Sequence, residues 1–228
     1  MMDFDFSQKI SRLAVAFVPM LLGIICHEVA HGWAAWKLGD PTAKNAGRLT
    51  LNPLSHMDPT GSLLFVLTAL VSPFILGWAK PVPVQPRYFR NPRKGMMLIS
   101  LAGPLTNFIL AFLFMVAYSL LLNALLKGSV TPGKSVEFLL KSFSAGVYIN
   151  IVLAWFNLIP LPPLDGSHIL GGLLPPHMAY RYYTLARYGM LVILVLVASG
   201  LFWKVLGPFV DTTADIMAHI AAVPVPFI

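Results

Sequence analysis

The sequence is poor in charged residues and in cysteine, and each scarcity excludes a class of protein. Only 11% of its 228 residues are charged, against about 25% in an ordinary soluble domain. A disordered chain is excluded, and so is a typical nucleic-acid-binding protein, despite a formal net charge of +7. The single cysteine excludes a disulfide framework and a zinc module built on several cysteines. Because 57% of the residues are hydrophobic, the composition indicates a membrane protein with several spans.

Four apolar stretches are long enough to cross a bilayer as helices, which takes about 20 residues. They cover residues 10–38, 97–126, 136–159 and 185–206. A fifth stretch, 61–79, is shorter and contains Pro73 and Gly77. Lysines and arginines crowd the loops at 39–60 and 80–96, so the positive-inside rule places both loops in the cytoplasm. The stretch between them must then enter and leave by one face, and we expect it to be re-entrant.

The expected fold is an all-α polytopic membrane protein with four full spans, one re-entrant segment and a small β-hairpin region on the cytoplasmic side. The hairpin is expected at residues 47–51 and 81–84, where residue types alternate as in short strands. Two uses of it are open: a simple hairpin at the membrane interface, or a strand edge to which an extended substrate adds.

The first apolar stretch contains Glu28, one of only two glutamates in the chain. A carboxylate inside a span costs several kcal/mol unless it is paired or used. Glu28 belongs to the run His27-Glu28-Val29-Ala30-His31. Residues four apart share a helix face, so both histidines can reach one metal ion, and Glu28 can hold a water molecule beside it. This is the HExxH pattern of zinc hydrolases.

A core role for one histidine would be ordinary, but two histidines and a glutamate at this spacing in a span have no simple structural explanation. Gly39, Asp40 and Pro41 end the helix. The helical rise then places the histidines about 12–18 Å from the cytoplasmic end of the span. A hydrolytic metal at that depth needs water, so a polar cavity is expected to open from the cytoplasm.

A catalytic zinc ion usually has three protein ligands, so a third must be found. The candidates on the expected cytoplasmic side are Asp40, His56, Asp58, Asp165, His168 and His177. Asp165 has the best setting, because prolines at 160, 162 and 163 break the third span just before it. A lone carboxylate at that depth is costly unless a metal neutralises it. The alternative is a solvated loop aspartate, and His56 and Asp58 could instead line the site.

Three motifs in this order resemble the site-2 protease family of intramembrane zinc metalloproteases. They are His27-Glu28-x-x-His31, Gly103-Pro104-x-x-Asn107, and Asn157 followed by Leu164-Asp165-Gly166. The resemblance covers about residues 10–175. Residues 47–53 and 80–84 are also similar to the compact branch of that family, which lacks PDZ and CBS domains.

The resemblance implies a role for each matching residue. His27, His31 and Asp165 would hold one Zn²⁺ ion per chain, and Glu28 would be the catalytic base. Asn157 would be catalytic, as an oxyanion or substrate-orienting group, and Asn107 would bind and position the substrate.

The function implied is a zinc endopeptidase that cleaves transmembrane segments of protein substrates in regulated intramembrane proteolysis. We expect one integral membrane metalloprotease domain over residues 1–228, with its core at 10–175 and a C-terminal span and tail at 185–228. The partners would be transmembrane substrates and the lipid bilayer, not nucleic acid, and homo-oligomerisation stays open. The chain would be a multi-pass protein of the cell membrane, with its active site facing the cytoplasm.

Two other functions use the same polar residues. A metal-ion transporter would need repeated halves or a path to both faces, and neither is evident in the sequence. A catalytically silent membrane chaperone on this scaffold would not need Glu28, which is present.

Overall fold

The computed structural model describes residues 6–61, 63–64, 67 and 79–223. The segment 61–79, expected to be re-entrant, lies outside the described residues except for a few positions at its two ends. No re-entrant or spanning arrangement is therefore assigned to it.

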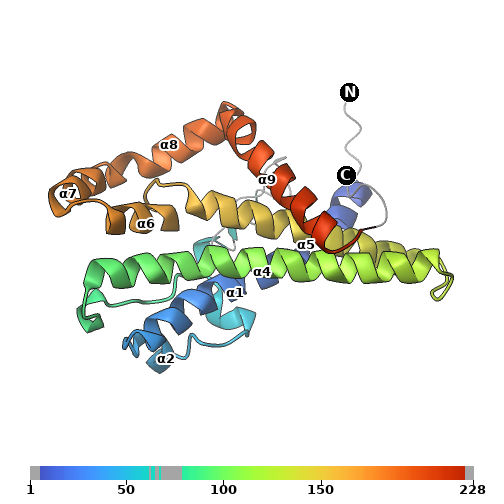
Figure 1. Ribbon diagram of the computed structural model, residues 1–228, viewed down its shortest axis with the longest axis horizontal. Coiled ribbons are helices and arrows are strands. Elements are labelled where there is room, and N and C mark those ends of the chain that lie inside the picture. The colour runs from blue at the N-terminus through green and yellow to red at the C-terminus, as the bar shows by residue number, and fades with distance from the viewer. Residues whose placement is uncertain (1–5, 62, 65–66, 68–78, 224–228) are drawn as a thin grey trace.

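Three long helices form the body of the protein: α1 (Phe6–Lys37), α4 (Pro92–Leu126) and α5 (Lys134–Leu158). Each contains a segment long and apolar enough to cross a membrane, which confirms the first three expected spans. Helices α4 and α5 run side by side along the long axis of the molecule, and α1 packs against both (Figure 1). The start of α4 is fixed locally, because the Asn91 side chain accepts a hydrogen bond from Lys94 N–H and Pro92 occupies the first turn.

The fourth expected span, 185–206, is not one helix. The chain forms α6 (Asp165–Leu173), α7 (Pro176–Thr184), α8 (Ala186–Ala198) and α9 (Leu201–Ile220). Gly200 separates α8 from α9 with a φ of 71°, a left-handed conformation that glycine adopts without strain. Helices α7 and α8 are bent by 59° at their junction and together qualify as one broken span. The described residues thus hold three spans, or four if the bent pair crosses as a unit.

Helix α9 folds back onto α4 and α5 (Figure 1). The buried core there comprises Ala111, Met115, Val147, Ile151, Leu206, Val210 and Ala214. Two polar contacts add to it: Trp155 Nε1–H donates to Thr213 Oγ1 at 3.0 Å, and the Ser119 hydroxyl donates to the carbonyl of Ala221 at 2.7 Å. This core joins α9 to α4 and α5.

Between α1 and α4, the expected β-hairpin does not form. The described residues there contain α2 (Thr42–Asn45) and two short 3-10 helices, η1 (Pro53–His56) and η2 (Pro86–Tyr88). Residues 47–51 and 81–84 are irregular, and the described part of the chain has a single isolated bridge, between Met57 and Ala79.

The reason is that side chains take the hydrogen bonds a strand partner would have used. Val82 N–H donates to Oε2 of Glu28 at 2.9 Å, and Gln85 N–H donates to Oδ2 of Asp40 at 2.6 Å. The Arg48 guanidinium donates to the carbonyl of Lys80. Prolines at 81 and 83 carry no N–H. The alternation of proline and valine therefore marks an extended segment anchored by side chains.

Asp40 joins this segment to the end of α1. Its fully buried carboxylate also accepts a hydrogen bond from Thr42 N–H at 2.9 Å. Burial raises the pKa of Asp40, but the hydrogen bonds from Gln85 and Thr42 outweigh burial and hold the pKa below its usual range. The charged carboxylate thus holds the 39–60 and 80–91 loops together at one end of the helices.

Candidate metal centre

Two helices bring three metal-ligating side chains to one point. His27 and His31 lie one turn apart on α1, and Asp165 is the first residue of α6. Oδ2 of Asp165 lies 3.1 Å from Nε2 of His27 and 3.2 Å from Nε2 of His31. The two Nε2 atoms are 2.9 Å apart. The three side chains are only 10%, 12% and 15% exposed.

Each imidazole is oriented by a hydrogen bond at its other nitrogen. Nδ1 of His27 faces Oδ1 of Asn107 at 2.6 Å, and Nδ1 of His31 faces the carbonyl oxygen of Ile99 at 2.8 Å. Both partners accept hydrogen bonds, so in the neutral rings the proton sits on Nδ1. Each Nε2 is then left with a lone pair that points at the other ring and at Asp165.

This donor set fits a zinc ion. Three lone pairs converge, and Oδ2 of Asp165 is buried with no hydrogen-bond partner among the described residues. Such groups repel one another unless a cation lies between them. Zinc bonds of about 2.0–2.2 Å in tetrahedral geometry would separate ligand atoms by about 3.3–3.5 Å, close to the 2.9–3.2 Å observed. His27, His31 and Asp165 are the residues that would hold the ion, as the sequence predicts.

Gly103 lets α4 come close enough to complete this arrangement. A Cβ atom at Gly103 would lie 2.6 Å from Cε1 of both His27 and His31, closer than such atoms pack. One turn further along α4, Asn107 holds the His27 ring. The spacing of the two residues thus has a physical reason. Gly103 leaves space for both imidazole rings, and Asn107, one turn later, accepts a hydrogen bond from the His27 ring.

Asn107 belongs to a buried network across three helices. Its amide nitrogen donates to the Gly23 carbonyl of α1 at 3.1 Å and to Oδ1 of Asn150 on α5 at 3.0 Å. The Asn150 amide nitrogen donates to the Gly146 carbonyl at 2.9 Å. Both asparagines are completely buried. With two acceptors facing its nitrogen, the Asn107 amide must direct its oxygen to His27.

Asp165 is positioned by the turn before α6 and by the far end of that helix. As the first residue of α6, its carboxylate lies where the helix dipole favours negative charge. The Arg93 guanidinium of α4 donates to the Gly171 carbonyl at 2.8 Å and also to the carbonyl of Leu174. These bonds fasten the C-terminal end of α6 to α4 and so fix the direction in which Asp165 points.

Two further predicted site residues lie outside the three-ligand group. Glu28 follows His27 on α1, and its Oε2 accepts the Val82 N–H. Asn157 lies near the end of α5, and its amide nitrogen donates to the Leu153 carbonyl of its own helix at 2.9 Å.

The other third-ligand candidates have other environments. The carboxylate of Asp58 accepts a hydrogen bond from Gly61 N–H at 2.8 Å. Nε2 of the buried His56 lies 2.8 Å from the Thr50 carbonyl. His168 lies 3.4 Å from the Tyr183 hydroxyl, and His177 is exposed. Within the described residues, Asp165 alone of the candidates joins the two histidines.

Three groups around the site were not predicted. They are the side chain of Asn150, the carbonyl of Ile99 and the N–H of Val82. Asn150 had a detectable signal, because an amide inside an apolar span is expensive unless it has a partner. The two backbone groups had none, since every residue except proline offers the same N–H and C=O.

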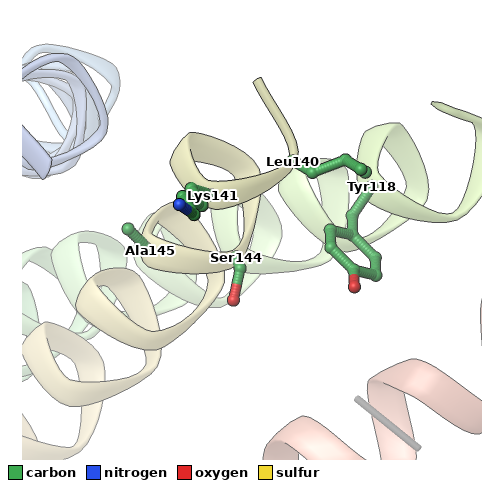
Figure 2. A pocket seen from close by; sticks show the side chains of 5 residues that line it. All are labelled: Tyr118, Leu140, Lys141, Ser144 and Ala145. Carbon is green, nitrogen blue, oxygen red and sulfur yellow. The ribbon is translucent and has the colours of Figure 1, made fainter. Parts of the chain in front are cut away.

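A surface hollow elsewhere has no part in this site. It is an open depression of about 370 Å³ between α4 and α5, lined by Tyr118, Leu140, Lys141, Ser144 and Ala145 (Figure 2). Tyr118 follows Asn107 on α4 by 11 residues, or about 16 Å of helix. The hollow contains none of the three ligands.

Comparison with known proteins gives a consistent result. "Peptidase family M50" matches residues 124–197. YwhC of Bacillus subtilis (strain 168), by name a zinc metalloprotease, is 38% identical over 214 residues, which are 94% of each chain. This chain belongs to peptidase family M50, the site-2 proteases. Rip2 of Mycolicibacterium smegmatis, also by name a zinc metalloprotease, is 28% identical over 78% of this chain and 64% of its own. No solved structure matches significantly.

Family membership decides the class of function. The chain is a zinc metalloprotease and, with its apolar helices, a multi-pass membrane protein whose surroundings are the lipid bilayer. Zinc is its cofactor, and the group formed by His27, His31 and Asp165 is suited to hold it. The metal-ion transporter and the silent chaperone are left without support.

Replacing Gly103 with alanine should weaken zinc binding by about 10-fold or more, the range for changes that disturb the orientation of metal ligands. The new methyl group would collide with both imidazole rings. Gly207→Ala on α9 is the matched control, because its Cβ would meet nothing within 4 Å. Chelator competition on the purified proteins measures both affinities. An unchanged affinity in Gly103→Ala would show that the rings need no such space.

Asp165→Ala should empty the zinc site at limiting zinc, whereas His56→Ala should keep zinc bound. The reason is that Asp165 faces both Nε2 atoms, while His56 faces the Thr50 carbonyl. Elemental analysis of the two purified variants measures the contrast. Zinc loss in His56→Ala together with full occupancy in Asp165→Ala would reverse the assignment.

Proposed function

We propose that this membrane zinc protease cleaves peptide bonds within transmembrane segments of protein substrates. The observation that supports this proposal is the position of the metal-ligating group inside an apolar helix. His27 and His31 lie 6 to 10 residues before the end of α1 at Lys37, or about 9–15 Å along the helix. A protease with its ligands at that depth is placed to meet a peptide bond that is itself within the membrane.

The chain's own residues divide the work of peptide hydrolysis. A zinc ion held by His27, His31 and Asp165 would supply a Lewis acid for the scissile carbonyl and for the attacking water. Glu28, beside the histidines, takes the proton from the attacking water and gives it to the leaving amine. Its Oε1 makes no hydrogen bond within the described part of the chain, so one carboxylate oxygen is available for this transfer.

The two predicted asparagines receive different roles. We assign Asn107 to the zinc ligand His27 rather than to the substrate, because its amide is completely buried and already bonded to His27, Gly23 and Asn150. Asn157 is only partly buried, and its oxygen is not used by the described residues. It therefore stays the candidate that orients the substrate or stabilises the oxyanion.

We also propose that the site opens to the cytoplasm. The 39–60 and 80–91 loops, which carry five lysines and arginines, are joined by Asp40 and Gln85 at the end of α1 nearest the histidines. Positive loops are retained in the cytoplasm. Water and the unwound substrate would then reach the metal from that side.

Glu28→Gln should keep zinc and fold but lower the turnover number by about 10²–10⁴-fold, the usual contribution of a general base. His27→Ala should lose zinc and activity together. The assay uses purified protein in liposomes with a panel of single-span test proteins, and mass spectrometry locates the cut. Activity retained in Glu28→Gln, or cuts only outside the span, would contradict the proposal.

The orientation can be tested with cysteines introduced into a Cys26→Ser background. Asn45, the last residue of α2, and Ser129, in the connection between α4 and α5, are both exposed. An impermeant thiol reagent added outside intact cells should label Ser129→Cys and spare Asn45→Cys. The reverse pattern would place the active site on the outer face.

A further inference from the structure

Glu28, the proposed base, contacts residues 80–85, a segment far from it in the sequence. Oε2 of Glu28 accepts a hydrogen bond from Val82 N–H, 54 residues later, at 2.9 Å. The segment is fixed on both sides of this contact. Before it, Lys80 N–H donates to the His56 carbonyl at 2.8 Å and Arg48 donates to the Lys80 carbonyl. After it, Gln85 N–H donates to Asp40.

The sequence of the segment leaves the Val82 N–H as the one backbone donor at the point of contact. Pro81 and Pro83 flank Val82 and have no N–H. Between Lys80 and Val84, Val82 therefore carries the only backbone N–H, and that group points at the carboxylate. Flanking prolines also restrict the backbone around Val82, so less conformational freedom is lost when the contact forms.

A glycine on α1 allows the segment to lie directly against the helix. Gly32 follows Glu28 by four residues and shares its face. A Cβ atom at Gly32 would lie 2.9 Å from Cγ1 of Val82 and 2.8 Å from Cδ2 of Leu49. The side chain and the backbone of Val82 thus approach the same face independently, one at Gly32 and the other at Glu28.

We infer that the Val82 amide is a positioning group for the general base. By binding Oε2, it fixes the rotamer of Glu28 and leaves Oε1 directed to the reacting water. The inference rests on the proposed function of Glu28. A charge-assisted hydrogen bond is among the stronger ones available to a carboxylate, and a misplacement of about 1 Å in a reacting group can cost about 10²-fold in rate.

Val82→Pro tests the inference, because it deletes the N–H and continues the proline pattern. The expected result is a turnover number lowered about 10–100-fold, with KM and zinc content unchanged. Val82→Ala keeps the N–H and shortens only the side chain that packs at Gly32, so it should lose much less turnover than Val82→Pro. Val84→Pro adds the same ring two residues later and should retain the turnover number. Kinetics with one cleavable single-span test protein in liposomes, with zinc measured on each sample, give the comparison.

A second variant and a second measurement guard against misfolding. Substituting 2-hydroxyisovaleric acid for Val82 replaces the N–H with an ester oxygen, keeps the side chain and should reproduce the loss in Val82→Pro. Thermal unfolding of the zinc-loaded proteins tests the contact without activity. Val82→Pro should lower the midpoint in the wild-type chain and lower it much less in a Glu28→Ala background, where the acceptor is missing.

The inference would be overturned if Val82→Pro had a turnover number within twofold of that of Val82→Ala, lost zinc together with activity, or had a raised KM with its turnover number intact. The last would make the segment a substrate contact. A higher turnover number in Val82→Pro would also overturn it, by making the contact inhibitory. Failure here is separable from failure of the proposed function: an inactive Glu28→Gln beside a fully active Val82→Pro refutes only the role of Val82.

Discussion

The structure depends on placing three bare lone pairs together in an apolar interior. Nε2 of His27, Nε2 of His31 and Oδ2 of Asp165 face one another within about 3 Å. None can satisfy another unless a proton or metal intervenes, and lipid offers no substitute. The protein enforces the arrangement by giving each Nδ1 an acceptor, Asn107 for one ring and the Ile99 carbonyl for the other. Both acceptors come from α4, so the packing of α4 against α1 is also what prepares the ligands.

Much of the site could be predicted because its residue types are costly where they stand. Two histidines and a glutamate in a span, and an aspartate after a proline-broken helix, have few uses other than a metal. The supporting layer could be predicted only in part. Asn150, like the histidines, is a polar residue that is costly inside an apolar span. The Ile99 carbonyl and the Val82 N–H, in contrast, are backbone groups that every residue except proline offers. Only the three-dimensional course of the chain selects them.

The fold could be predicted where hydrophobicity alone determines a helix. It could not be predicted where tertiary packing or side-chain hydrogen bonds override the sequence pattern. The first three spans follow from length and apolar composition. The stretch 185–206 has the same composition, yet Gly200 divides it, because α9 gains a core and two polar contacts by turning back onto α4 and α5. The alternation at 81–84 resembles a strand, but two of its residues lack N–H groups and a third donates to Glu28. Pattern does not reveal that a side chain will replace a strand partner.

The metal-ligating group and the proposed base are supported mainly by different parts of the chain. His27, His31 and Asp165 depend on contacts among α1, α4, α5 and α6, which are side-chain and helix-backbone contacts inside the bundle. Glu28 depends on a loop whose anchors, Asp40, Arg48 and the His56 carbonyl, lie at the end of the bundle. We therefore expect a change confined to the contact between Val82 N–H and Glu28 to act on the proposed base more than on the metal-ligating group. His27 and Glu28 are adjacent in the sequence, but their hydrogen-bond partners come from different parts of the chain, α4 for His27 and the 80–85 segment for Glu28.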